Sequence, residues 1–174
     1  MNTEQMKVGG RYETWIDPRI NRNSWEAGVW DDEPDKIIWR DSTTRYICMV
    51  KRSHHGVWCG YVGVDPTHKL HGKSYQDIDE DSLDVHGGLT FSEACHHGPM
   101  ESTICHVPDP GEPDNVWWFG FDCGHGYDYS PGTKSIFESH DFDVITGMGE
   151  VYRDLEYVTN ETVKLAKQLK ELES

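Results

Sequence analysis

Histidines and carboxylates stand beside glycines in two segments of this chain. The first segment, residues 84–91, contains His86 followed by Gly87 and Gly88, and the second, residues 117–128, ends in a polar stretch after an apolar run. Loops that are carried on a rigid sheet are common places for binding and catalytic groups. We therefore expect two strand ends to bring four side chains into one shallow pocket: His86, Asp122, His125 and Asp128.

The residue types in this pocket are typical of acid–base chemistry. An aspartate can orient an imidazole as a general base, and a second histidine can protonate a leaving group. The predicted catalytic residues are His86, Asp122 and His125, in hydrolysis or transfer at a phosphoryl or glycosyl centre. The structural alternatives are a bulge at the glycines with His86 hydrogen-bonded inside, and an Asp122 that caps its own loop.

Other residues nearby are suited to holding a ligand. Glycines let a ligand approach the backbone closely, a tryptophan can stack on a purine, and Arg153 at a helix start can hold a phosphate or carboxylate. An ion pair of Arg153 with Glu150, Asp154 or Glu156 is the alternative. The predicted ligand-binding residues are Gly87, Gly88, Thr90, Trp118, Asp128, Tyr152 and Arg153.

A metal site is weighed beside this pocket, because seven cysteines and histidines lie within about thirty residues and zinc needs only four ligands. They are Cys95, His96, His97, Cys105, His106, Cys123 and His125. Their spacing does not match that of paired zinc-binding motifs. We assign no metal-ligating residue, and the cofactor is left unknown with zinc as an open alternative.

The composition limits the partners. The formal charge is -15 at pH 7, which opposes binding to nucleic acid and to anionic membranes. We find neither an export signal nor the roughly 18 consecutive apolar residues of a membrane helix, and five cysteines are an odd number. We expect reduced thiols and a cytoplasmic protein with a small-molecule ligand. A homo-oligomer is left open.

The predicted fold is a single α+β domain over residues 1–174. Residues 1–35 form an irregular, tryptophan-rich segment, and apolar residues at three- and four-residue steps predict a long amphipathic helix over residues 150–173. The helix should cover an antiparallel or mixed sheet of about five strands. The segments predicted as strands are residues 37–40, 45–51, 57–64, 83–91 and 115–122.

Two segments also resemble a known family. Val85 to Thr90 (VHGGLT) and Trp118 to Cys123 (WFGFDC) followed by His125 and Asp128, together with Tyr152, Arg153 and the closing helix, resemble small uncharacterised proteins encoded in phages and prophages. The resemblance covers about the last hundred residues. Gly124 and Gly126 depart from it, since alanine-like residues are expected there. It implies a small accessory phage protein acting against host defence, in the host cytoplasm, by analogy of gene context.

Two functions follow as hypotheses. The first is a pocket that binds a nucleotide-like small molecule such as a signal of host immunity, with hydrolysis of that molecule as an additional activity left open. The second is an acidic protein-binding inhibitor or DNA mimic without catalytic activity. The acidic runs that would carry mimicry are Asp31, Asp32, Glu33 and Asp35, and then Asp77, Asp79, Glu80 and Asp81. Such runs are more often only solvated loops.

Overall fold

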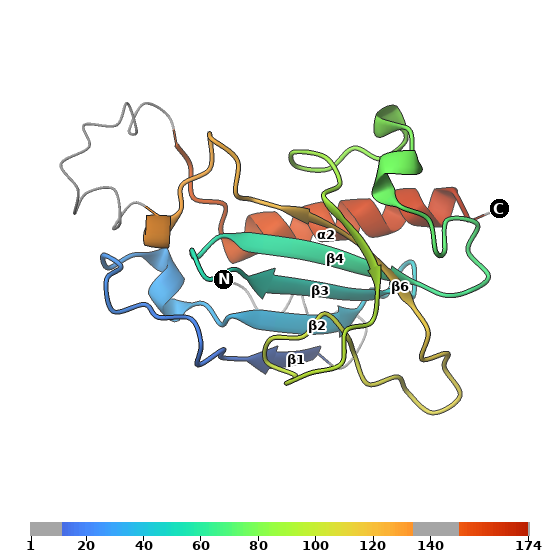
Figure 1. Ribbon diagram of the computed structural model, residues 1–174, viewed down its shortest axis with the longest axis horizontal. Coiled ribbons are helices and arrows are strands. Elements are labelled where there is room, and N and C mark those ends of the chain that lie inside the picture. Colours follow the sequence, from blue (N-terminus) through green and yellow to red (C-terminus); the bar gives the residue numbers. More distant parts are fainter. Residues whose placement is uncertain (1–11, 134–149, 174) are drawn as a thin grey trace.

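An antiparallel sheet of six strands forms the centre of the protein (Figure 1). The computed structural model describes residues 12–133 and 150–173, and within these ranges the strand order is β1-β2-β3-β4-β6-β5. The strands are β1 (Tyr12–Trp15), β2 (Lys36–Arg40), β3 (Ile47–Arg52), β4 (Trp58–Val64), β5 (Phe91–Ala94) and β6 (Trp117–Asp122). The α+β fold predicted from the sequence is confirmed.

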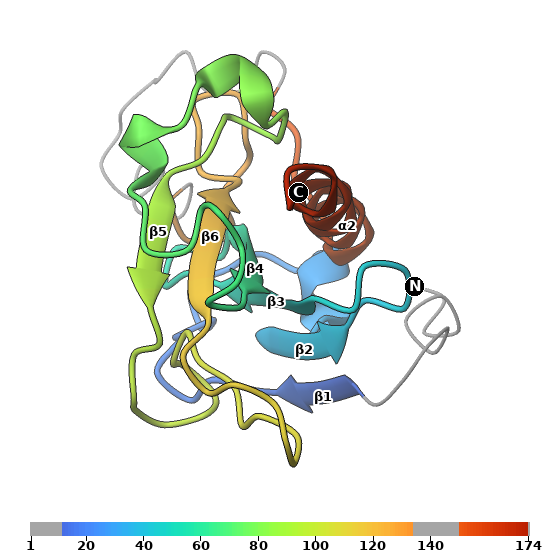
Figure 2. The same ribbon diagram turned by 90° about the vertical axis from the view of Figure 1, so that its right-hand side faces the viewer.

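Helix α2 (Leu155–Glu171) lies across one face of this sheet (Figure 2). Its buried positions recur at three- and four-residue steps and pack against the apolar side of the central strands; they are Leu155, Val158, Thr162, Leu165, Ala166 and Leu169. The side chain of Asp154 accepts a hydrogen bond from the Tyr157 N–H at 2.9 Å, which caps the first turn. The predicted covering helix is therefore present.

The helix begins at Leu155 and not at residue 150, because the preceding residues are extended. The N–H of Val151 donates to the carbonyl oxygen of Tyr127 at 3.1 Å, and the N–H of Tyr129 donates to the carbonyl oxygen of Val151 at 2.9 Å. These hydrogen bonds tie residues 150–153 to the loop that follows β6. Arg153 consequently lies beside that loop, just before the helix.

The opposite face of the sheet is covered by irregular chain from the segment 95–116. Met100 and Ile104 from this segment pack on a second apolar cluster, which contains Trp118. A disulfide joins Cys95 to Cys105, with Cα atoms 4.8 Å apart. The expectation that all five thiols are reduced is wrong for this pair. The chain folds back between the two cysteines and brings them together, although their spacing in the sequence did not indicate a disulfide. Cys48, Cys59 and Cys123 are free thiols.

Residues 12–35 are more ordered than the sequence predicts. They contain strand β1, the 3-10 helix η1 (Val29–Asp32) and part of a buried ion network. The guanidinium of Arg52 is fully buried and pairs with Asp35 at 3.2 Å and with Glu33 at 3.4 Å. Half of the first acidic run is therefore internal and not a solvated loop, because it neutralises a buried arginine.

The strand expected over residues 83–91 is also corrected. Phe91–Ala94 alone forms β5, and the residues before it form a loop after the 3-10 helices η2 (Tyr75–Asp77) and η3 (Glu80–Ser82). Gly87 and Gly88 have φ angles of 69° and 79°, a left-handed conformation that a strand does not contain. His86 therefore lies on a loop and not at a strand end.

No helix in the described part of the chain combines the length and the apolar character needed to cross a bilayer.

Lys36 gives a test of how the 95–116 segment is held. Its side chain is fully buried, and its ammonium donates to the carbonyl oxygens of Met100 and Thr103. Burial, with a further contribution from the charge of Lys51, lowers the pKa of Lys36 from 10.5 to about 8. At a pH between these two pKa values, Lys36 holds a proton in the unfolded chain that it has released in the folded chain. The contribution of Lys36 to the unfolding free energy therefore rises with pH in this range.

We expect Lys36→Met to destabilise the protein by about 1–3 kcal/mol, because two buried carbonyl groups lose their donor. The difference in unfolding free energy between wild type and variant should be larger at pH 9 than at pH 7. Urea unfolding of both proteins at the two pH values measures this difference. The contributions of titrating groups that both proteins share cancel in the difference. A difference that shrinks as the pH rises would contradict this placement of Lys36.

Candidate functional site

Three separate segments deliver the candidate site. The loop 83–90 provides His86, the loop after β6 provides residues 122–128, and the extended residues before α2 provide Arg153. The first loop is held to the helix by reciprocal hydrogen bonds between the Asp84 backbone and the Gln168 side chain, at 2.7 and 2.9 Å. The His86 N–H also donates to Glu161 at 3.2 Å. The helix therefore fixes where His86 lies.

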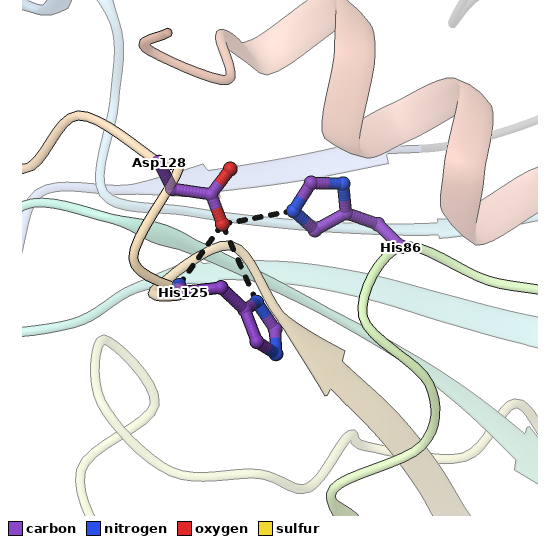
Figure 3. A group of neighbouring side chains, drawn as sticks. All are labelled: His86, His125 and Asp128. Carbon is purple, nitrogen blue, oxygen red and sulfur yellow. Dashed lines mark hydrogen bonds and ion pairs between the residues drawn. The ribbon is translucent and has the colours of Figure 1, made fainter. Parts of the chain in front are cut away.

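The carboxylate of Asp128 is the centre of the site (Figure 3). Its Oδ2 atom lies 2.8 Å from His86 Nε2 and 3.3 Å from His125 Nδ1, and it accepts the backbone N–H of His125 at 3.0 Å. Its Oδ1 atom accepts a hydrogen bond from Arg153 Nε at 3.0 Å. The side chain is fully buried, so both oxygens are satisfied by protein groups.

These contacts determine the charge of Asp128. Burial by itself would raise the pKa of the carboxyl group, but the hydrogen bonds from His86, the His125 backbone and Arg153 outweigh it and hold the pKa below its usual value. Hydrogen bonds to the ionised form have this effect. Asp128 is therefore a carboxylate at neutral pH.

His86 is enclosed by its partners. Its side chain is only 5% exposed, its Nε2 faces Asp128, and its Nδ1 lies 2.7 Å from the hydroxyl of Tyr157. Both ring nitrogens are therefore engaged by protein groups, which fixes the orientation of the imidazole. The catalytic role predicted for His86 stays a prediction.

His125 is the more accessible histidine. Its side chain is 27% exposed, and its Nε2 lies 3.7 Å from Oδ1 of Asp122. The Nδ1–H of His125 points to the buried carboxylate, which leaves Nε2 as the nitrogen with a free electron pair on the exposed side. Thr90 donates to the same Asp122 oxygen at 3.3 Å. The exposed face of the site is therefore formed by Thr90, Asp122 and His125.

Gly87 is required by packing as well as by its backbone. A Cβ atom built on Gly87 would overlap the imidazole ring of His125, whereas one built on Gly88 would meet nothing within 4 Å. The two glycines thus have different tasks, although both adopt positive φ angles. Gly87 lets the loop lie against His125, and Gly88 lets the chain turn.

Two of the predicted ligand-binding residues lie elsewhere. Trp118 is fully buried in the apolar cluster under the 95–116 segment, because alternate residues of a strand face opposite sides of the sheet. Tyr152 joins the buried ion network, where its hydroxyl donates to Glu33 at 2.6 Å and accepts from Arg52 at 2.9 Å. The other predicted residues, Gly87, Gly88, Thr90, Asp128 and Arg153, do surround the site.

Two tyrosines at the site escaped the sequence analysis. Tyr127 is 48% exposed and its ring stacks on that of His125, with ring centres 5.6 Å apart. Tyr157 bonds His86 and lies under the guanidinium of Arg153, which is 4.9 Å from its ring centre. Tyr127 stands within the motif and could have been noted, whereas Tyr157 reaches the site only because the helix packs there.

The cysteine and histidine cluster weighed for zinc does not assemble. Cys95 and Cys105 form the disulfide, and Cys123 is buried, which raises the pKa of its thiol. Within the described ranges, one group of three or more His, Cys, Asp or Glu side chains has donor atoms close enough to hold a metal ion. It consists of His86, His125 and Asp128.

No family model, curated protein or solved structure matches this chain. The site is therefore interpreted from its own geometry.

Asp128 and Asp122 form a matched pair for mutation. We expect Asp128→Asn to lower the unfolding free energy by about 1–3 kcal/mol, because the buried acceptor of hydrogen bonds from His86, His125 and Arg153 loses its charge. Asp122 is 36% exposed, and Asp122→Asn should change stability by about 0.5 kcal/mol or less. Chemical unfolding of both variants measures this. Equal losses would show that Asp128 is not the centre of the site.

The glycines form a second matched pair. Gly88→Ala should cost about 1–2 kcal/mol from left-handed backbone alone. Gly87→Ala carries the same cost and must in addition displace His125, so we expect a larger loss of stability and a shifted His125 ring resonance in NMR spectra. If both variants lose the same stability and leave that resonance unchanged, the contact between Gly87 and His125 is wrong.

Proposed function

We propose that this protein binds a phosphorylated, nucleotide-like small molecule at the exposed face formed by Thr90, Asp122 and His125, and that His125 promotes its hydrolysis. One observation carries the proposal. A buried, ionised Asp128 holds Nδ1 of a partly exposed His125, which leaves Nε2 facing outwards. An imidazole oriented in this way by a carboxylate is the usual arrangement of a general base.

The proposed reaction needs no group beyond these side chains and water. Nε2 of His125 takes a proton from a water molecule, whose oxygen attacks phosphorus while the bond to the leaving oxygen breaks. The imidazolium then returns the proton to the leaving oxygen. Asp128 stabilises the imidazolium in the interval, because its charge lies beside Nδ1.

Arg153 supports the binding of an anion. Its Nε–H donates to Asp128, and this hydrogen bond does not involve the two terminal Nη groups. The Arg153 side chain is 23% exposed. A guanidinium held at one edge keeps its other donors in a fixed orientation, which suits phosphate oxygens. It is a local cation in a protein of net charge -15.

The nucleoside part of such a ligand also has surfaces to contact. The exposed ring of Tyr127 stacks beside His125 and offers the aromatic face that the sequence analysis sought in Trp118. A hollow of about 710 Å³ adjoins Gly87 and Gly88, and its rim includes Asp79, Glu80, Asp81 and Asp84. These carboxylates suit the amino and hydroxyl donors of a nucleoside and disfavour its phosphates.

The biological setting remains part of the proposal. The resemblance of residues 85–90 and 118–128 to small phage proteins motivates a role in counter-defence, in which a nucleotide signal of the host is sequestered or cleaved. What supports it in the structure is only the chemistry of the site.

The acidic-inhibitor alternative retains one observation in its favour. Asp77, Asp79, Glu80 and Asp81 are exposed. The first acidic run offers less, since Asp35 is buried and Glu33 is nearly so. Mimicry of DNA would therefore rest on one run.

A panel of nucleotides and cyclic nucleotides tests the proposal, with thermal shift reporting binding and phosphate or nucleotide release reporting hydrolysis. We expect one member to bind, and His125→Ala to abolish hydrolysis, because the general base is lost, and to weaken binding, because the ring that lines the ligand is lost. Arg153→Lys should weaken binding while preserving a cation beside Asp128. His54→Ala, at an exposed histidine outside the site, is the matched control.

Binding that is unchanged in His125→Ala and Arg153→Lys would contradict the proposal. So would the absence of any ligand in the panel. Loss of the biological effect on neutralising Asp79, Glu80 and Asp81, with steep salt dependence, would favour the acidic-inhibitor alternative.

A further inference from the structure

The donor atoms of His86, His125 and Asp128 converge on one point. One donor atom from each residue lies within 4.8 Å of the other two. Oδ2 of Asp128 is 2.8 Å from His86 Nε2 and 3.3 Å from His125 Nδ1. The donors of a tetrahedral zinc ion, with bonds of about 2.0–2.1 Å, lie roughly 3.3 Å apart. The two distances to Asp128 are therefore close to this spacing, and the two histidines of the group offer donor atoms within 4.8 Å of each other.

The far side of each of these residues also has a partner. Nδ1 of His86 faces the Tyr157 hydroxyl at 2.7 Å, and Nε2 of His125 faces Asp122 at 3.7 Å. The second oxygen of Asp128 is held by Arg153. Metal-binding histidines characteristically donate their remote N–H to a carboxylate or another acceptor, and metal-binding carboxylates are themselves hydrogen-bonded. His86 and Asp128 have such an outer hydrogen bond, and His125 faces a carboxylate 3.7 Å away.

We propose that Nε2 of His86, Nδ1 of His125 and Oδ2 of Asp128 bind one divalent transition-metal ion of the zinc class, with a fourth position occupied by water. Each neutral imidazole keeps one proton, which moves from the nitrogen facing Asp128 to the remote nitrogen. There the proton is donated to Tyr157 by His86 and to Asp122 by His125. The ion takes the place of the two hydrogen bonds to Oδ2.

The ligand set decides the class of metal. Two imidazoles and one carboxylate suit zinc and its neighbours, whereas Mg²⁺ and Ca²⁺ prefer oxygen alone. Three protein ligands are typical of zinc sites that keep a position for water or substrate. Asp128 and Asp122 supply two negative charges close to the ion, and the exposed edge of His125 provides access from solvent.

Metal binding goes beyond the proposed function and does not depend on it. The ion would bind these side chains whether or not a phosphorylated ligand is present. Where both occur, a metal-bound water replaces the water activated by His125, because zinc lowers the pKa of its bound water. The ion would also add a positive charge to that of Arg153 for holding a phosphate.

The test uses Zn²⁺ and Co²⁺ alone, without nucleotide. Titration of the purified full-length protein against a chromophoric chelator should give one equivalent of bound Zn²⁺, and Mg²⁺ should not compete. His125→Ala should weaken Zn²⁺ binding at least ~10-fold. His54→Ala and His97→Ala, at exposed histidines outside the cluster, should bind as wild type does and thereby exclude binding by surface histidines.

Two further measurements identify the ligands without breaking the buried pair. Tyr157→Phe removes the outer partner of His86 alone and should weaken Zn²⁺ binding by about 10-fold or more. Co²⁺ should give tetrahedral visible absorption without a thiolate charge-transfer band, and Cys123→Ala should leave this spectrum unchanged. A thiolate band would assign the metal to cysteine and overturn the proposal.

Other results would also overturn it. They are the absence of stoichiometric Zn²⁺ binding, binding that survives intact in folded His125→Ala, or loss of binding in His97→Ala. Because no nucleotide is present, these outcomes are separate from those of the ligand panel. Zinc binding without nucleotide binding would support the metal site and contradict the proposed function, and the reverse result would do the opposite.

Discussion

The carboxylate of Asp128 is buried, ionised and bonded through both of its oxygens, and its partners come from three parts of the chain. A charge without water around it is stable only when such partners are in place. The loop 83–90, the loop after β6 and the residues before α2 therefore meet at a single side chain. The loss of this charge would leave His86, His125 and Arg153 without their shared acceptor.

The same geometry suits both proposed kinds of chemistry. With protons on the nitrogens that face Asp128, His125 is an oriented base on the surface of the protein. With an ion at that point, the two histidines are ligands and their protons lie on the outer nitrogens. Tyr157 and Asp122 face the outer nitrogens in both forms, but the hydrogen bond between Tyr157 and His86 changes direction. The difference between them is whether protons or a metal ion neutralise the carboxylate.

The sheet and helix provide the rigidity that this arrangement needs. Arg52 is buried against Asp35 and Glu33 near the start of α2, where Glu33 also accepts the Leu155 N–H at 2.6 Å. This second network fixes the beginning of the helix, and the helix in turn holds the loop of His86. On the other face, Lys36 and the disulfide hold the 95–116 segment over Trp118. The two faces of the sheet are thus fixed by separate sets of contacts.

The sequence by itself determined the fold class, four of the strands and the covering helix, because alternating and three-to-four-residue apolar patterns depend only on local geometry. It also singled out His86, His125, Asp128 and Arg153, since histidines and charges beside glycines are visible without a structure. Only the tertiary structure decided their roles. Contacts between residues far apart in the chain decide which nitrogen of His86 meets Asp128. They also decide why Tyr157 belongs to the site and why Trp118 does not. No local pattern in the sequence records which of these groups become buried together.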